Sequence, residues 1–202
     1  HIGYNGSFWS STEYGSNDAW HRGLESNDST IYRRDYGKDS GFSVRCVRNE
    51  TDTILVPYST GWNLVGLPLD VEDSNYLTIF PDAIENTLYS FDDAYTSDSI
   101  MILGEGYWLR FESAGNTTIT GNTINELTIS LNEGWNLISG ISTPIDISAI
   151  QDPDGIIIPG TVYGFASGGY SNAEILEPGK GYWVRCFNDG EILIPEIEET
   201  TV

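Results

Sequence analysis

The sequence predicts a mainly β protein, with a short N-terminal module followed by two copies of one small antiparallel β-sandwich or barrel-like domain. A repeat carries this prediction: Gly-Trp-Asn-Leu at 61–64 returns at 134–137, and Gly-x-Gly-Tyr-Trp-x-Arg at 104–110 returns at 179–185. The offset grows only from 73 to 75 residues, so one unit has been duplicated with small loop insertions. Composition agrees, because the chain holds 22 glycines and only two lysines, which is typical of a secreted β protein.

Residues 1–50 form the first predicted module. Tyr32, Tyr36, Phe42 and Val44 fall at even spacings between polar residues, which indicates short strands joined by turns. The polar run at 49–53 is a plausible linker to the first repeat.

Three motifs of this module resemble a known family. They are Phe-Trp-Ser-Ser-Thr-Glu at 8–13, Ala-Trp at 19–20 and Ser-Gly-Phe-Ser-Val-Arg-Cys-Val-Arg at 40–48. In this order they resemble the closing section of the Fibrobacter succinogenes major paralogous domain, which is found on bacterial surface and secreted proteins. The last motif is also similar to the end of formylglycine-generating and C-type-lectin-like folds. The resemblance implies a partial lectin-like module without the catalytic cysteine pair of the formylglycine enzymes.

The two repeats are expected at 54–121 and 127–195, followed by an acidic tail at 196–202. Period-two alternation places Tyr107 and Leu109 of the first copy, and Tyr182 and Val184 of the second, on the inward face of a strand. Short helices are expected at 79–85 and 145–150, limited to a turn or two by Pro81 and Pro144. The Gly-Trp-Asn-Leu repeats resemble modules of large secreted proteins from Bacteroidetes-like bacteria, often near carboxy-terminal sorting regions.

The charge balance excludes two classes of partner. Thirty acidic against nine basic residues give a net charge of −21, which repels phosphate backbones and makes nucleic acid a poor partner. No apolar run reaches the roughly eighteen residues that a membrane helix needs, so membrane insertion is not expected.

Two strand positions are candidates for a carbohydrate-binding platform. Trp108 and Arg110 in the first copy, and Trp183 and Arg185 in the second, share the outward face of their strands. An indole beside a guanidinium can stack on a sugar, although the same pair can also simply stiffen an exposed sheet face.

The tryptophans of the Gly-Trp-Asn turns, Trp62 and Trp135, suggest a structural role instead. An indole at the start of a strand can cover one end of a small core while its N–H donates to a carbonyl oxygen.

Acidic loops and cysteines give further candidates. The spacing of Asp152 and Asp154, followed by glycine, can begin a calcium cage, with solvated loops as the alternative; no other cofactor is expected. Cys186 replaces Phe111 of the first copy, so a buried free thiol is the simplest expectation, and a disulfide with Cys46 is the alternative. No Gly-x-Ser-x-Gly nucleophile motif occurs, and no catalytic residues are predicted.

The sequence therefore favours a non-enzymatic structural or adhesive protein, located outside the cell on a bacterial surface. The N-terminal module carries more apolar residues than fifty residues of isolated strand can cover, and its edges could pair with another chain. One expectation is completion by strand addition between copies, which would build a filament; completion by a further segment of the same polypeptide is the other. The alternative is a carbohydrate-binding module that recognises surface glycans.

Overall fold

The computed structural model describes residues 5–25, 31–40, 51–166 and 168–195. The chain divides into two compact units, His1–Asn49 and Glu50–Val202. Within the described residues the fold is mainly β and the paired strands are antiparallel, which confirms the predicted fold class. No helix among these residues has the length and apolar character needed to span a membrane.

The first unit contains an antiparallel meander. Its strands are β1 (Asn5–Glu13), β2 (Asp18–Glu25) and β3 (Ile31–Gly37), with β2 in the middle. The guanidinium of Arg33 lies 4.1 Å from the centre of the Trp20 ring, a cation–π contact that ties β3 to β2. The strand predicted around Phe42 and Val44 lies outside the described residues, and the resemblance to lectin-like folds stays a prediction.

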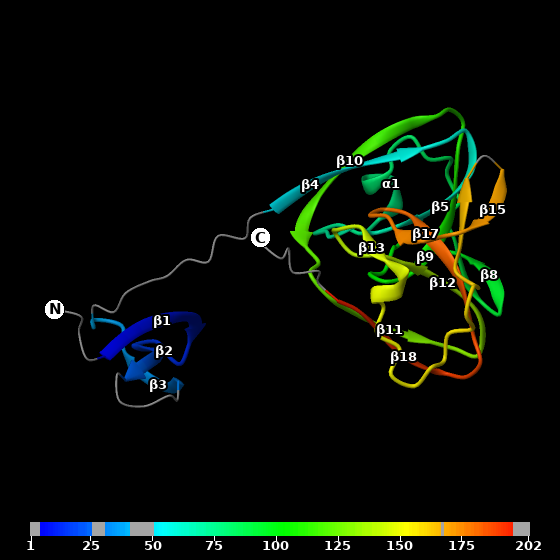
Figure 1. The fold of residues 1–202 in the computed structure, drawn as a ribbon. Helices are drawn as coiled ribbons and strands as arrows, with labels where there is room; N and C mark the ends of the chain where they lie inside the picture. Colours follow the sequence, from blue (N-terminus) through cyan, green and yellow to red (C-terminus); the bar gives the residue numbers. More distant parts are fainter. Residues whose placement is uncertain (1–4, 26–30, 41–50, 167, 196–202) are drawn as a thin grey trace, which may run out of the picture. The chain divides into compact units, whose positions relative to one another are not determined.

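The second unit consists of two lobes, one for each repeat (Figure 1). The first lobe contains β4 (Thr51–Tyr58), β5 (Gly61–Gly66), β6 (Leu69–Asp70), α1 (Tyr76–Ile79), β7 (Tyr89–Asp92), β8 (Ala94–Ser97), β9 (Gly106–Phe111) and β10 (Gly115–Thr123). The second lobe contains β11 (Leu127–Leu131), β12 (Gly134–Ser139), β13 (Ile145–Asp146), the 3₁₀ helix η1 (Ile147–Ala149), β14 (Tyr163–Ala166), β15 (Gly169–Asn172), β16 (Ile175–Leu176), β17 (Gly181–Cys186) and β18 (Gly190–Ile194).

Most equivalent strands of the two lobes are paired in the same way, but β6 pairs with β10 whereas its counterpart β13 pairs with β16. A four-stranded sheet has the order β5-β9-β7-β8 in the first lobe and β12-β17-β14-β15 in the second. The pair β4–β10 lies at one end of the unit and the equivalent pair β11–β18 at the other, with the four-stranded sheets between them (Figure 1). The equivalence inferred from the sequence repeat therefore extends to the strand order of the four-stranded sheets.

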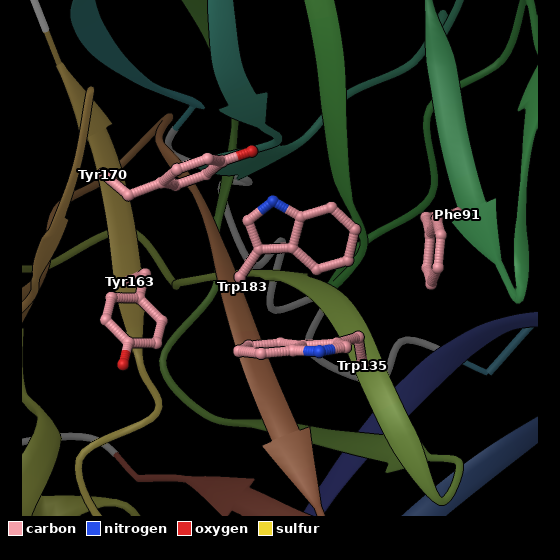
Figure 2. A pocket seen from close by; sticks show the side chains of 5 residues that line it. All are labelled: Phe91, Trp135, Tyr163, Tyr170 and Trp183. Atoms are coloured by element: carbon pink, nitrogen blue, oxygen red, sulfur yellow. The ribbon is translucent and has the colours of Figure 1, made fainter. Parts of the chain in front are cut away.

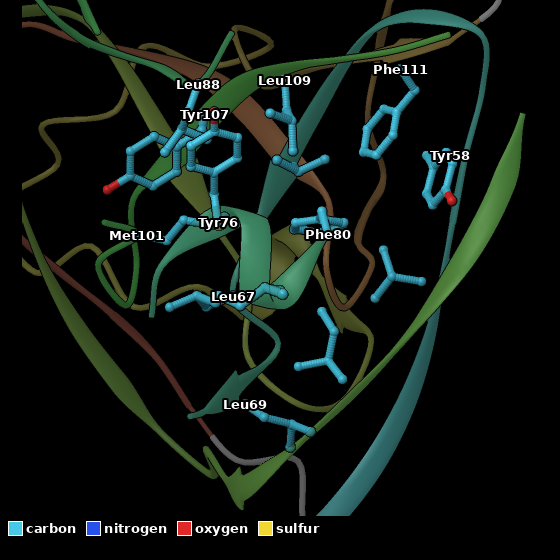
Figure 3. Packing of buried hydrophobic residues seen from close by; sticks show 14 residues of the cluster. Tyr58, Leu67, Leu69, Tyr76, Phe80, Leu88, Met101, Tyr107, Leu109 and Phe111 are labelled. Carbon is cyan, nitrogen blue, oxygen red and sulfur yellow. The ribbon is translucent and has the colours of Figure 1, made fainter. Parts of the chain in front are cut away.

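Each lobe has its own apolar core, formed by alternate residues of its strands. Tyr107 and Leu109 of β9 are buried in the first core, and Tyr182 and Val184 of β17 in the second, as predicted. In the first core, Tyr76 and Phe80 of the α1 segment pack among residues of the sheet (Figure 3). Burial of large apolar side chains supplies the main driving force for such a small lobe.

The Gly-Trp-Asn motif builds the turn that precedes each four-stranded sheet. Gly61 and Gly134 have φ angles of 86° and 95°, a left-handed conformation that favours glycine. The Asn63 side chain closes the turn, since its Oδ1 accepts from the Ser59 N–H and its Nδ2 donates to the Ser59 carbonyl, both at 2.8 Å. Asn136 makes the same pair of bonds with Asn132.

One predicted helix is displaced and the other is a single turn within its predicted range. The helix expected at 79–85 occupies Tyr76–Ile79 instead, because the Asn75 side chain caps it by accepting from the Leu77 N–H at 3.0 Å. Pro81 follows directly after the C-cap residue Phe80. The helix expected at 145–150 is reduced to the single 3₁₀ turn η1, with Asp146 as its N-cap.

The two lobes are joined by backbone contacts between the repeated motifs. The sequence predicted separate domains at 54–121 and 127–195. The first core lies within 54–121, the second also includes Ile124 and packs against Leu103 of the first lobe, and both cores lie in one compact unit. The Gly66 N–H donates to the Gly179 carbonyl at 3.2 Å, and the equivalent Ser139 N–H donates to the Gly104 carbonyl at 2.8 Å. Each lobe therefore completes the hydrogen bonding of the other.

Small residues allow this close approach. A Cβ on Gly106 would lie 2.6 Å from the Ile138 carbonyl oxygen, and a Cβ on Gly181 would lie 2.9 Å from that of Val65. Where the two copies differ, at Gly66 and Ser139, a Cβ on the glycine would collide with the serine Cβ. Only one of these two positions has room for a side chain.

We predict that Gly66→Ala destabilises the second unit by about 1–3 kcal/mol through overpacking against Ser139. Ser139→Gly makes room for the new methyl group, so the double variant should lose less than the sum of the single losses, with a coupling of about 1 kcal/mol. Urea unfolding measures all four chains. Gly169→Ala is the matched control because a Cβ there meets no neighbour. If the double variant loses as much as the two single variants together, the contact between residues 66 and 139 is contradicted.

Candidate functional site

Aromatic side chains gather on the faces of the four-stranded sheets that point away from the two cores. Leu64, Leu137 and Trp183 form a third buried cluster, against which further aromatic residues of both lobes are packed: Phe91, Trp108, Tyr163 and Phe165. Beside this cluster, the aromatic surface opens into two pockets.

The first pocket lies over the sheet of the second lobe and has a volume of about 490 Å³. Its wall is entirely aromatic: Phe91, Trp135, Tyr163, Tyr170 and Trp183 (Figure 2). The Trp135 ring lies 6.0 Å from both the Trp183 and the Tyr163 ring. The volume falls in the range of small-ligand sites, which is about 300–1,000 Å³.

The second pocket lies over the sheet of the first lobe and has a volume of about 380 Å³. It is lined by Trp62, Tyr89, Tyr95 and Trp108, which the repeat aligns with Trp135, Tyr163, Tyr170 and Trp183. The ring distances match those of the first pocket: Trp62 lies 5.9 Å from Tyr89 and 6.3 Å from Trp108. The two pockets are therefore copies of one site.

Each lobe contributes a ring to the neighbourhood of the other lobe's tryptophan. Phe91 of β7 lies 4.8 Å from Trp183, and the equivalent Phe165 of β14 lies 4.8 Å from Trp108. The β-hairpin of each lobe that carries this phenylalanine therefore contacts the tryptophan of the other lobe. The geometry of both pockets depends on the lobes staying together.

The predicted pairing of Trp108 with Arg110, and of Trp183 with Arg185, is wrong in detail. Arg110 lies over the Trp62 ring at 6.0 Å and Arg185 over the Trp135 ring at 5.8 Å. These pairs are directly opposite each other on neighbouring strands, which brings side chains closer than positions two apart on one strand. The exposed guanidinium groups therefore lie beside the tryptophans of the Gly-Trp-Asn turns.

Trp108 and Trp183 do line the pockets, but they are not open platforms. Trp183 is only 8% exposed and belongs to the third cluster, while Trp108 is half-buried. They form the inner wall, and the more exposed aromatic residues form the outer one.

Trp62 and Trp135 belong to neither core, so the predicted covering of a core end is not observed, and a wider structural role for them stays a prediction. Their side chains are 41% and 40% exposed, and they line the pockets rather than covering the ends of the cores. The sequence signal was that both copies keep tryptophan at this position, and the structure adds that the position packs in neither core.

Tyrosine hydroxyls add polar groups to the aromatic wall. Burial raises the pKa of Tyr170, and its hydrogen bond with Trp183 acts in the opposite direction. A neutral phenol can donate and accept hydrogen bonds. Each pocket thus combines ring faces with hydroxyls and a neighbouring guanidinium.

Asp152 has a structural role in the loop where calcium was predicted. Its two carboxylate oxygens accept from the N–H groups of Ile156 and Ile157, both at 2.9 Å, while Asp154 is exposed. Among the described residues, no group of three or more His, Cys, Asp or Glu is placed to hold a metal ion. Calcium binding by Asp152 and Asp154 stays a prediction.

Cys186 is a buried free thiol in the second core, which is the simpler of the two expectations for it. Burial, and after it the charge of Asp152, raises the pKa of this thiol to about 11. The alternative partner, Cys46, lies outside the described residues.

Comparisons with known proteins give no relative for the chain. No family model matches it, and the searches of curated proteins and of solved structures find no match.

We predict that Asp152→Ala costs about 1–3 kcal/mol of unfolding free energy, because two backbone N–H groups lose their acceptor. Asp154→Ala should change stability by less than about 0.5 kcal/mol. Thermal unfolding should rank the wild-type chain and the two variants in the same order of stability with EDTA as with millimolar calcium. A rise in Tm with calcium that Asp154→Ala abolishes would show instead that the loop binds the ion.

Proposed function

We propose that the second unit is a non-enzymatic, extracellular carbohydrate-binding module, and that its two aromatic pockets hold sugar rings of an uncharged glycan. An adhesive role on a bacterial surface follows from this activity. The proposal rests on the contrast between the pockets and the cores of the two lobes.

The pocket residues are identical in the two copies, whereas the cores have diverged. Every aromatic residue of the second pocket has the same residue type at its equivalent position in the first, and Arg110 is matched by Arg185. In the cores, Phe111 is replaced by Cys186 and Leu109 by Val184. Packing alone tolerates such changes, so retained exposed aromatic residues favour binding.

The chemistry of the pockets fits sugars. The face of an aromatic ring carries partial negative charge and attracts the polarised C–H groups of a pyranose ring. Tyrosine hydroxyls and the guanidinium groups of Arg110 and Arg185 can bond to sugar hydroxyls. The net charge of −21 repels uronic and sulfated glycans, which favours an uncharged ligand.

We predict that the protein binds one or more of insoluble cellulose, xylan and mannan in a pull-down assay. The double variant Trp62→Ala/Trp135→Ala should bind at least about tenfold more weakly, because it loses the exposed ring of both pockets. Phe187→Ala is the matched control, since this side chain is 54% exposed and lines neither pocket. Retention of a proline-rich peptide but of none of the glycans would replace this proposal by peptide binding.

Self-association through the first unit is a second candidate. In the described residues, β1 and β3 each pair only with β2, so each has one edge available for another strand. Strand addition by a second copy would use these edges and build the filament expected from the sequence.

We expect the full chain to form oligomers in light scattering, while residues 50–202 alone stay monomeric. The first unit is the part removed, so the difference assigns the contact to it. A strictly monomeric full chain at concentrations up to the millimolar range would contradict strand addition.

A further inference from the structure

We infer that one chain carries two equivalent and simultaneously usable sugar sites, so that it binds a polymeric glycan bivalently. The inference deepens the proposed function and rests on it. It adds that each chain has two sites and that the preferred ligand is a polymeric glycan rather than a short sugar.

The equivalence of the two pockets is geometric as well as chemical. In each, a tryptophan from a Gly-Trp-Asn turn meets the inner tryptophan at a steep angle, 85° for Trp135 with Trp183 and 86° for Trp62 with Trp108. In each, an arginine of the neighbouring strand lies over the outer ring. Two sites with the same rings in the same arrangement should accept the same ligand.

The pockets are also neighbours. Tyr170 lines the first pocket, and its ring lies 6.4 Å from Trp108, which lines the second. Tyr95 lines the second pocket, and its ring lies 6.5 Å from Trp183, which lines the first. Rings of one site therefore contact rings of the other, and the backbone contacts between lobes fix the separation.

A fixed pair of adjacent sites favours polymers over short sugars. Once one pocket holds a sugar segment, the second meets other segments of the same glycan at high effective concentration. The rigid connection between the lobes avoids the entropy cost of ordering a flexible linker. A short oligosaccharide that fills only one pocket gains nothing from this arrangement.

The two sites need not be equally strong. The first pocket is larger, and its inner tryptophan is more deeply buried than Trp108. We therefore expect two affinities that differ by less than about tenfold, since the lining rings are the same.

Isothermal titration with cellotriose, xylotriose and mannotriose tests the number of sites. The wild-type chain should bind at least one of them at two sites. Trp62→Ala and Trp135→Ala should each leave one site whose Kd is close to the wild-type value. Phe187→Ala should keep both sites, and circular dichroism checks that every variant is folded.

The soluble polymers hydroxyethyl cellulose, arabinoxylan and galactomannan test the joint use of the sites. For the polymer matching the bound trisaccharide, either single tryptophan variant should weaken binding by on the order of 10- to 100-fold, because only one pocket remains. For the trisaccharide, the same variant should only halve the number of sites.

The outcomes separate the inference from the proposed function. One trisaccharide site per wild-type chain, or two sites without any gain in affinity for the polymer, overturns bivalent binding and leaves sugar binding in place. Failure of the wild-type chain to bind any of these trisaccharides, polymers or insoluble glycans overturns both. The wild-type stoichiometry alone is decisive if a variant does not fold.

Discussion

The close backbone approach between the two lobes is the constraint on which the rest of the second unit depends. Gly106 and Gly181 lie against carbonyl groups of the opposite lobe, at distances that leave no room for a side chain. The N–H groups of Gly66 and Ser139 donate to carbonyls of the other repeat. Separating the lobes would remove the hydrogen-bond partners of these groups. An N–H group that is buried without a partner costs free energy, so the lobes are held together.

This constraint explains why one motif carries both structure and site. In Gly-x-Gly-Tyr-Trp, the second glycine permits the contact between lobes, the tyrosine enters its own core, and the tryptophan faces the opposite lobe. The residues of Gly-Trp-Asn-Leu also have separate roles. Gly and Asn build the turn, Trp is exposed, and the leucine, Leu64 or Leu137, packs in the cluster that both lobes share. A strand that alternates its faces can serve two surfaces at once.

The sequence predicted those features that depend on local pattern. Alternation identified the inward residues of β9 and β17, and the repeat identified the two cores. Contacts between distant segments could not be obtained in this way. The prediction assigned Arg110 to Trp108 on its own strand, whereas cross-strand register places it over Trp62. The joining of the lobes was missed for the same reason, since nothing in one repeat shows what its outward face meets.

Between the two repeats, core residues have been substituted while pocket residues have been kept, and Phe111 with its counterpart Cys186 is one example. In the first lobe Phe111 stacks on Tyr58 with ring centres 3.9 Å apart, and both positions have lost their aromatic residue in the second lobe, where Leu131 and Cys186 stand. A stacked pair can be exchanged together because the core needs only volume and apolar character. The pocket rings were not exchanged, although several of them are exposed and contribute less to stability. Retention of rings at exposed positions such as Trp62, Trp135, Tyr95 and Tyr170 is the pattern expected of the proposed binding by ring faces.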